Sequence, residues 1–311
     1  MTTILFSHDD SLSHVTPPGH PEQVERYRVI QAALAASPFA PLDRREAPIA
    51  DRADLLRCHP ESYIASVEAA VPERGIVAVD PDTHLSSGSL GAVMRAAGGA
   101  VAAVDAVLAG EARNAFVAMR PPGHHAETSR AMGFCLFGNL AIAARRALDH
   151  HGLDRVAVVD FDVHHGNGTQ DLLWDEERAL FISSHQMPLW PGSGHPSEAG
   201  AHGNVINVPL APQTGSAAMR RAYDEIVFPA LEEFEPQLVL VSAGFDAHAA
   251  DPLAELNWTT EDFIWVTGRI CDIAEDHAQA RVVSVLEGGY DLDALAETVA
   301  AHVRVLMERG A

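Results

Sequence analysis

Hydrophobic and polar positions follow one another along the chain in two recurring patterns. Short runs that are apolar throughout are typical of buried strands, and longer amphipathic or small-residue segments are typical of helices. The expected strands are Ile4–Phe6, Ala115–Met119, Arg155–Phe161, Leu180–Ser183, Val205–Val208, Leu238–Ser242 and Val282–Leu286. The expected helices are Pro21–Ala35, Leu90–Ala109, Asn139–His150, Ser216–Glu233, Thr259–His277 and Leu292–Met307.

Local signals refine three of these helices. Asn139 is a typical N-cap residue for the helix that follows it. Thr259 and Asp262 have the spacing of a capping box at the start of another helix. Pro229 has no amide hydrogen to donate, so it predicts a bend or an interruption within residues 216–233.

The alternation of apolar strands with helices indicates the fold class. Strands buried on both faces are typical of a mostly parallel sheet that is covered by helices on both sides. We therefore predict a single α/β domain over residues 1–311, built on an open, mostly parallel sheet. In such sheets, ligands bind beyond the carboxyl ends of the strands.

Ionisable or phenolic side chains follow four of the expected strands. Because the carboxyl ends of parallel strands lie at one edge of the sheet, these side chains are expected to converge there. In chain order they are His124 and His125, Asp162 and His164, Asp246, and Tyr290.

The stretch 158–170 concentrates this chemistry. A β-branched run leads into Asp160, Asp162 and His164, and the stretch ends in what is expected to be a Gly-Asn-Gly turn at residues 166–168. If the backbone stays extended, these three side chains share one face of the strand. Buried carboxylates and imidazoles are unfavourable unless they are paired or bind a metal ion. Oxygen and imidazole ligands together suit a divalent ion such as zinc.

These groups predict a hydrolytic site. Asp162, His164 and Asp246 would give zinc three protein ligands, which leaves one position open, as in catalytic zinc sites. Zinc acidifies water and polarises a carbonyl group. His124 and His125 could act as base and acid, and Tyr290, which follows two glycines, could hydrogen-bond a developing oxyanion. The simplest reaction for this set is hydrolysis of an amide.

Net charge limits the choice of partners. The chain has 43 acidic and 21 basic residues and a formal charge of −22, so we expect no binding of nucleic acid through a basic surface. The simpler explanation of the acidic excess is that it keeps the protein soluble. The alternative explanation is that it steers cationic substrates, such as polyamines or lysine side chains, toward the protein.

Cysteine usage and hydropathy indicate a cytoplasmic protein. Three scattered cysteines do not make a disulfide framework, which favours a reducing compartment. The N-terminus lacks a basic leader followed by a long apolar core. The most apolar long segment, residues 87–110, is broken by Arg95 and Asp105, so we expect a buried helix and no membrane span.

Five motifs together resemble the zinc-dependent histone deacetylase superfamily, including its class II-like bacterial amidohydrolases, acetylpolyamine amidohydrolases and acetoin-utilisation proteins. They are RPPGHHA at 120–126, GFC at 133–135, DFDVHHGNGTQ at 160–170, SAGFD at 242–246 and EGGY at 287–290. His20-Pro21-Glu22 and Arg26 also resemble the N-terminal loop of that family.

The resemblance implies roles for the residues in these motifs. Asp162, His164 and Asp246 match the zinc ligands. His125 matches the general base and acid, and His124 matches its electrostatic partner, which Asp160 holds. Asn167 lies where some branches of the family have Asp and the class II-like branch has Asn, so this chain is similar to class II. A neutral residue there would leave His125 less basic than an aspartate would. Tyr290 matches the tyrosine that stabilises the oxyanion.

The resemblance also implies a substrate channel and a second ion. Gly133, Phe134 and Trp190 match the channel lining, although Trp190 replaces the more usual Phe or Tyr. Polyamine-specific relatives have an acidic residue seven positions after the third ligand, where this chain has Leu253, which favours acyl-lysine or another small acyl amide. The residues that match the family's potassium site are Asp160, Asp162, His164 and Ser183.

Three alternatives remain beside an acyl-lysine deacetylase. An acetylpolyamine amidohydrolase would use the same site on a different amine. An arginase-like dimanganese hydrolase would need additional bridging carboxylates, commonly Asp-x-His-x-Asp, whereas this chain has Asp-x-Asp-x-His. A non-catalytic sensor of acyl ligands would not need Tyr290 or the histidine pair. A homo-oligomer is compatible with every one of these interpretations.

Overall fold

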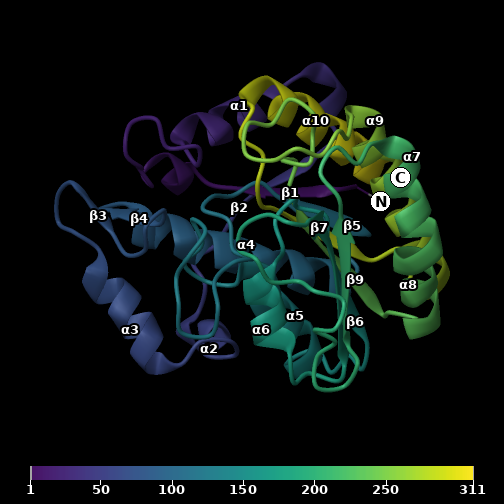
Figure 1. Ribbon diagram of the computed structural model, residues 1–311. Coiled ribbons are helices and arrows are strands. Elements are labelled where there is room, and N and C mark those ends of the chain that lie inside the picture. Colours follow the sequence, from purple (N-terminus) through teal and green to yellow (C-terminus); the bar gives the residue numbers. More distant parts are fainter. Residues whose placement is uncertain (1, 311) are drawn as a thin grey trace.

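The computed structural model describes residues 2–310 and is built around one eight-stranded sheet (Figure 1). Its strand order is β2-β1-β5-β10-β9-β6-β7-β8, and every neighbouring pair is parallel. The predicted open α/β sheet is therefore confirmed. The strands are β1 (Ile4–Ser7), β2 (Asp43–Glu46), β5 (Asn114–Val117), β6 (Val156–Asp160), β7 (Ala179–Gln186), β8 (Val205–Leu210), β9 (Leu238–Ala243) and β10 (Val282–Leu286).

Helices cover both faces of this sheet. They are α1 (Val24–Leu34), α2 (Arg52–Leu55), α3 (Glu61–Ala70), α4 (Ser89–Leu108), α5 (Asn139–Asp149), α6 (Asn167–Leu173), α7 (Ser216–Ala222), α8 (Phe228–Phe234), α9 (Thr260–His277) and α10 (Leu292–Gly310). Short 3₁₀ turns lie at Asp9–Leu12 and Ser37–Phe39. Helices α4 and α5 pack against one face of the sheet, and α1, α9 and α10 pack on the other.

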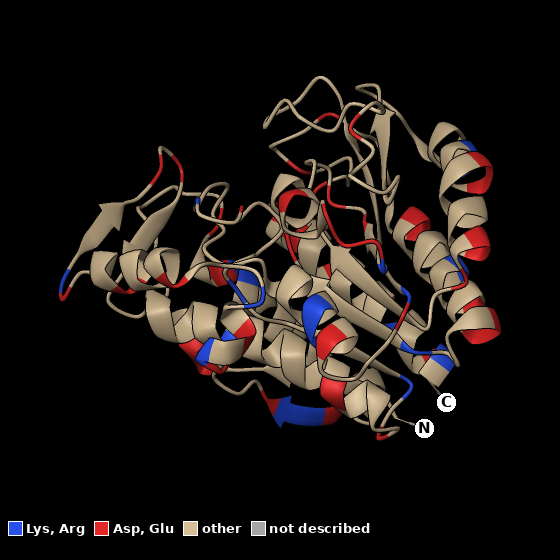
Figure 2. Cartoon of the chain, turned by 90° about the horizontal axis from the view of Figure 1, so that it is seen from below, with Lys and Arg blue, Asp and Glu red and all other residues tan. Residues whose placement is uncertain are grey.

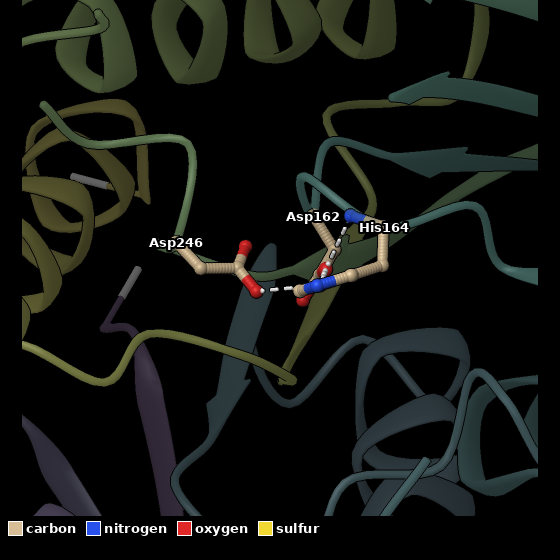
Figure 3. Close-up of side chains that lie close together, drawn as sticks. All are labelled: Asp162, His164 and Asp246. Atoms are coloured by element: carbon tan, nitrogen blue, oxygen red, sulfur yellow. Dashed lines mark hydrogen bonds and ion pairs between the residues drawn. The ribbon is translucent and has the colours of Figure 1, made fainter. Parts of the chain in front are cut away.

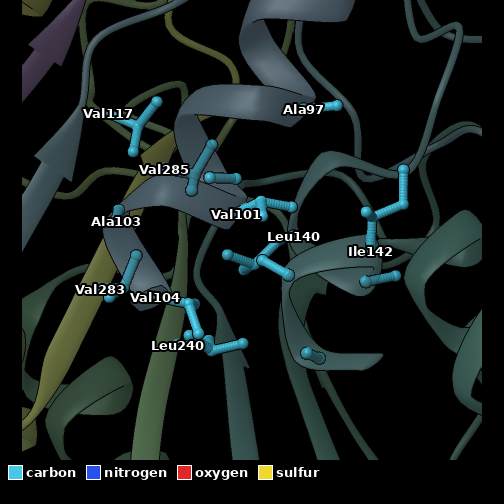
Figure 4. Close-up of a cluster of buried hydrophobic side chains, with 14 of the residues drawn as sticks. Ala97, Val101, Ala103, Val104, Val117, Leu140, Ile142, Leu240, Val283 and Val285 are labelled. Atoms are coloured by element: carbon cyan, nitrogen blue, oxygen red, sulfur yellow. The ribbon is translucent and has the colours of Figure 1, made fainter. Parts of the chain in front are cut away.

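Each face of the sheet contributes to its own hydrophobic core. On the first face, Val283 and Val285 of β10 and Leu240 of β9 pack against residues of α4 and α5, such as Val104 and Leu140 (Figure 4). Alternate residues of the same strands, such as Val239 and Val241, pack on the second face. Side chains of a strand alternate between faces, so a strand that is apolar throughout supplies both cores.

Helix α4 is long and apolar enough to cross a membrane, but it lies in the core. About two thirds of its most apolar window is buried (67%). Its small residues allow close packing: a Cβ atom at Gly98 would lie 2.1 Å from the carbonyl oxygen of Pro48. The interpretation of residues 87–110 as a buried helix is confirmed.

Of the three local helix signals in the sequence, two are confirmed and one is wrong. The capping box is present, since the Asp262 carboxylate accepts the backbone N–H of Thr259 at 3.0 Å. Helix 216–233 is interrupted, as predicted, by a π-helical turn at Tyr223–Val227 just before Pro229. Asn139, however, is not the N-cap. Gly138 occupies that position, and the Asn139 side chain instead donates to the carbonyl of Pro121 at 3.3 Å.

Several elements were not predicted. Strand β2 is Asp-Arg-Arg-Glu, and an edge strand of this kind has no apolar run to mark it. Strands β3 (Ile76–Ala78) and β4 (His84–Ser86) form a separate two-stranded sheet and have only three residues each. Helix α3 could have been found, because Tyr63, Ile64 and Val67 are buried at helical spacing.

Acidic residues are spread over the helices and loops, with basic residues interspersed among them (Figure 2). All 21 basic side chains in the chain are arginines, because the sequence contains no lysine.

Candidate active site

The four strands that carry the predicted site residues are adjacent, in the order β5-β10-β9-β6. Their carboxyl ends therefore meet at one edge of the sheet, as expected from the rule for parallel sheets. The loops after these strands deliver His124 and His125, Tyr290, Asp246, and Asp162 with His164.

Two local predictions for this edge are wrong. Strand β6 ends at Asp160, so Asp162 and His164 do not share a face of an extended strand. They lie in a bend, where the Asp160 carboxylate accepts the backbone N–H of Asp162 at 3.1 Å. The expected Gly-Asn-Gly turn is also wrong, because α6 begins at Asn167. The bend thus replaces strand alternation as the means of bringing these side chains together.

Asp162, His164 and Asp246 form a compact, buried cluster (Figure 3). The His164 Nδ1 atom lies 3.1 Å from Asp246 Oδ2 and 3.2 Å from Asp162 Oδ1. One donor atom from each of the three residues lies within 4.8 Å of the others. A carboxylate pair and an imidazole at this spacing fit a divalent metal ion such as zinc.

Backbone groups hold the two carboxylates in place. Asp162 Oδ2 accepts the N–H of Gly288 at 2.8 Å, and Asp246 Oδ1 accepts the N–H of Val163 at 2.8 Å. The approach of Gly288 requires glycine, since a Cβ atom there would lie 2.2 Å from Asp246 Oδ2. The Glu-Gly-Gly-Tyr segment therefore shapes the cluster as well as carrying Tyr290.

The electrostatics of the cluster favour a bound cation. Burial and the charge of Asp162 raise the pKa of Asp246 to about 6, despite its hydrogen bond to His164. Burial lowers the pKa of His164, but hydrogen bonds and charges from the two carboxylates outweigh burial and raise it to about 10. Two buried carboxylates so close together repel each other unless a proton or a metal ion lies between them.

The two histidines of the pair have opposite electrostatic environments. His124 Nδ1 lies 3.0 Å from Asp160 Oδ2. Burial lowers the pKa of His124, but the charges of Asp162 and Asp160 outweigh burial and raise it well above its ordinary value. Burial and the positive charges of His124 and His164 hold the pKa of His125 well below its ordinary value. His124 is therefore the charged member of the pair and His125 the neutral member.

Hydrogen bonding fixes the tautomer of His125. The side-chain amide of Asn167 donates to Glu127 Oε1 at 2.8 Å, which leaves its carbonyl oxygen facing His125 Nδ1, also at 2.8 Å. A carbonyl oxygen can only accept, so Nδ1 carries the proton. The lone pair of the neutral imidazole is then on Nε2.

Tyr290 lies beside this pair with its phenol protonated. Burial and the nearby carboxylates raise its pKa well above its ordinary value, although Arg26 opposes them. The Arg26 guanidinium lies 4.9 Å from the centre of the Tyr290 ring. The backbone N–H of Tyr290 donates to Asp251 Oδ2 at 2.7 Å, which fixes the turn that carries the ring.

A cavity of about 180 Å³ opens above the cluster. The Trp190 ring stands edge-to-face with His125, with centroids 4.7 Å apart, and the rings of Phe134 and Tyr290 are 5.8 Å apart. The lining consists of Asp82, His125, Gly133, Phe134, His164, Leu189, Trp190, Leu253 and Tyr290. All four residues predicted to contact substrate thus line one narrow channel together with the histidine and tyrosine.

Ser183 lies one strand away from the cluster. In the register of β6 and β7 it pairs with Asp160, and its hydroxyl lies 3.0 Å from His185 Nδ1. The structure therefore places Ser183 beside the loop of Asp160, Asp162 and His164, and the potassium site stays a prediction.

Four carboxylates of this region had been given no role from the sequence. Glu127 orients Asn167, and Asp251 holds the Tyr290 turn. Glu287 Oε2 accepts the N–H groups of Gly123 and His124 at 2.6 and 3.1 Å. Asp82 lies in the channel lining. Glu127 directly follows one recognised motif and Glu287 is the first residue of another, so their positions were a usable signal, whereas Asp82 and Asp251 gave none.

Comparisons with known proteins give a family for the chain. Residues 20–306 match the family model described as the histone deacetylase domain. The chain is 44% identical over 284 residues to a histone deacetylase-like amidohydrolase of Pseudomonas aeruginosa, covering 89% of this chain and 74% of the relative. It is 39% identical over 299 residues to a probable deacetylase of Archaeoglobus fulgidus, covering 94% and 82%.

A solved structure shares the fold. The crystal structure of the HDA15 HD domain superposes with a TM-score of 0.93 at 31% identity, covering 99% of this chain and 89% of that chain.

Proposed function

This chain belongs to the histone deacetylase family, and we propose that it is a zinc-dependent amidohydrolase that removes an acetyl or short acyl group from acyl-lysine or a related acylated amine. The observation that carries this proposal is the position of the Asp162, His164 and Asp246 cluster. It lies next to a neutral histidine and a protonated tyrosine at the base of a narrow channel.

The proposed zinc ligands are Asp162, His164 and Asp246. Their donor set and spacing fit one zinc ion with a coordination position left for water or substrate. When bound, zinc supplies a Lewis acid that acidifies water and polarises the amide carbonyl. We further propose that potassium is held near Asp160, Asp162, His164 and Ser183.

The side chains around the channel then divide the chemistry. His125 Nε2 takes a proton from the attacking water and returns it to the amine nitrogen as the C–N bond breaks. His124 keeps a positive charge beside the developing negative charge, and Asp160 holds its ring. The Tyr290 hydroxyl donates a hydrogen bond to the oxygen that becomes negative in the tetrahedral intermediate.

The channel favours a thin aliphatic chain. Phe134 and Trp190 provide apolar walls for the methylene groups of a lysine side chain. Leu253 in the lining provides no charge for the second amine of a polyamine, which favours acyl-lysine. The acetylpolyamine alternative is favoured by a different observation, because the lining also contains the carboxylate of Asp82.

The experiment that tests the proposal measures turnover of a matched pair, an acetyl-lysine peptide and N-acetylputrescine, with zinc-loaded enzyme. We expect the peptide to have the higher kcat/KM. A preference for N-acetylputrescine would instead support the acetylpolyamine alternative, with Asp82→Asn as the variant that abolishes the preference. Binding of both compounds without turnover would identify a sensor and reject the enzyme.

Metal content tests the ligand set separately. We expect one zinc ion per chain in the purified protein and none in Asp246→Ala, because two remaining ligands hold zinc weakly. Elemental analysis by mass spectrometry gives the stoichiometry, and His195→Ala, a change at an exposed histidine, is the control. Full zinc occupancy in Asp246→Ala would reject the ligand assignment, and two manganese ions per chain would favour the arginase-like alternative.

A further inference from the structure

Asp251 is a buried residue whose carboxylate contacts two walls of the channel. Its Oδ2 atom accepts the backbone N–H of Tyr290 at 2.7 Å and that of Asp291 at 3.3 Å. Its Oδ1 atom accepts the backbone N–H of Leu253 at 3.0 Å. Tyr290 and Leu253 both line the channel. One carboxyl group therefore joins the turn after β10 to the loop after β9.

The loop that carries Leu253 is closed at its base by backbone hydrogen bonds. Ala249 donates its N–H to the carbonyl of Trp258 at 2.9 Å, and Trp258 donates its own N–H to the carbonyl of Ala247 at 3.1 Å. Leu253 lies between these residues in the chain, beyond the closed base. The Asp251 carboxylate thus fixes the middle of this loop relative to the turn after β10.

The position is unfavourable for a charged group. Burial and the charge of Asp246 raise the pKa of Asp251 to about 7, although its hydrogen bonds to the backbone lower it. A neutral polar side chain would avoid part of this cost. A carboxylate, however, has two acceptor oxygens, whereas an amide or a hydroxyl group has one. Two acceptors on one side chain are what this position needs in order to hold both walls.

We propose that Asp251 is a positioning residue, which holds the Tyr290 hydroxyl at the reacting carbonyl group and the Leu253 side chain against the substrate chain. This inference rests on the proposed function. An oxyanion donor must lie within hydrogen-bond distance of the position that the oxyanion takes, and a misplacement of about 1 Å can cost about 100-fold in rate. Asp251 acts through the two backbone segments that it holds and takes no part in proton transfer.

Removal of the carboxylate tests this role in the zinc-loaded enzyme. Asp251→Ala deletes all three hydrogen bonds, so we expect kcat for the acetyl-lysine peptide to fall about tenfold or more and KM to rise several-fold, with zinc content unchanged. Asp251→Asn keeps the shape of the side chain and one acceptor oxygen, and should give smaller losses of the same kind. Wild-type kcat and KM in both variants would overturn the proposal.

A double-mutant cycle separates positioning from a general loss of structure. If Asp251 affects kcat through Tyr290, Asp251→Ala should lower kcat by less than about a further twofold in the Tyr290→Phe background. The rise in KM should persist in that background, because it comes from the Leu253 wall. Two kcat losses that multiply in full would show that Asp251 acts elsewhere, which contradicts the proposal.

Asp262→Ala is the matched control. Asp262 is also buried, and its carboxylate also accepts a backbone N–H, that of Thr259 at the start of α9. This substitution should lower the melting temperature and leave kcat and KM unchanged, because Asp262 holds no part of the channel lining. Equal kinetic losses in the two alanine variants would indicate a general structural effect and reject the positioning role.

Hydrogen–deuterium exchange tests the two contacts without turnover. In Asp251→Ala, amide exchange should become faster both at residues 290–291 and at residue 253, and in Asp262→Ala at neither. Unchanged exchange at either wall would reject the joining role, whatever the substrate is. A wild-type protein that turns over neither acylated amine would reject the proposed function and the role of Asp251 in hydrolysis, while the exchange rates would still show whether Asp251 joins the two walls.

Discussion

Of the residues that line the channel, Tyr290 is the one whose side chain has a hydroxyl group. Its role as oxyanion donor predicts that Tyr290→Phe keeps metal and substrate binding but loses turnover. Removal of one oxyanion donor costs about 10²–10³ in kcat in other enzymes, and we expect a loss of this order with KM changed little. Kinetics on the acetyl-lysine peptide measure both constants. An unchanged kcat would exclude the role.

Asn167 sets how basic His125 is. A neutral amide next to His125 Nδ1 stabilises the imidazolium less than a carboxylate would. Asn167→Asp should therefore raise the pKa of His125, and because the base works only when unprotonated, the acidic limb of the kcat/KM profile should move to higher pH.

The pH–rate profile of Asn167→Asp measures this shift. Glu127→Gln is the control, because it leaves residue 167 neutral. An acidic limb that does not move, in a variant that is folded and metal-loaded, would argue against His125 as the base.

The loop after β7 carries Trp190 and is fixed to the body by Glu198. The Glu198 carboxylate accepts N–H groups from Gly194 and His195 at 3.1 and 3.0 Å, and from the Gln170 side chain at 2.7 Å. Because Trp190 forms a channel wall, release of this loop should affect substrate binding more than chemistry.

We therefore expect Glu198→Ala to raise KM several-fold while kcat changes less. Glu177→Ala, which removes the same charge from an exposed position, should leave both constants unchanged. A fall in kcat alone, or equal effects of the two substitutions, would contradict a positioning role for Glu198.

His302 of helix α10 is buried next to strand β10 and makes the free energy of unfolding depend on pH. His302 Nδ1 lies 2.8 Å from the Thr267 hydroxyl and Nε2 lies 2.9 Å from the Ser284 hydroxyl. Burial lowers its pKa from 6.5 to about 3. Below pH 6.5 the unfolded chain therefore binds a proton that the folded chain does not, and the free energy of unfolding falls as the pH falls toward 3.

This residue alone should make the free energy of unfolding fall by about 1.4 kcal/mol per pH unit in that range. In His302→Gln the pH slope should be lower by one proton, although the variant is expected to be less stable at neutral pH. Urea titrations at several acidic pH values give the slope, and an identical slope in both proteins would contradict the account.

The sequence by itself determined the fold class and the candidate residues for the site. Strands apolar throughout require burial on both faces, and this requirement leads to a parallel sheet and to a site beyond its carboxyl edge. The residue types after β5, β6, β9 and β10 are unusual enough in buried positions to mark candidate site residues without coordinates.

Only the tertiary structure decided how those residues meet. The contact of Glu127 with Asn167 joins residues 40 positions apart in the chain, and the turn held by Asp251 joins residues 39 positions apart. The bend after Asp160 depends on a local hydrogen bond from the backbone N–H of Asp162 to the Asp160 carboxylate, which no periodicity encodes. Short polar elements such as β2 also escaped prediction, since they are stabilised by the neighbouring strand and carry no hydrophobic pattern of their own. Hydrophobic burial is a property of each segment and can be inferred from its residues, whereas polar contacts are decided by which segments the folded chain brings together.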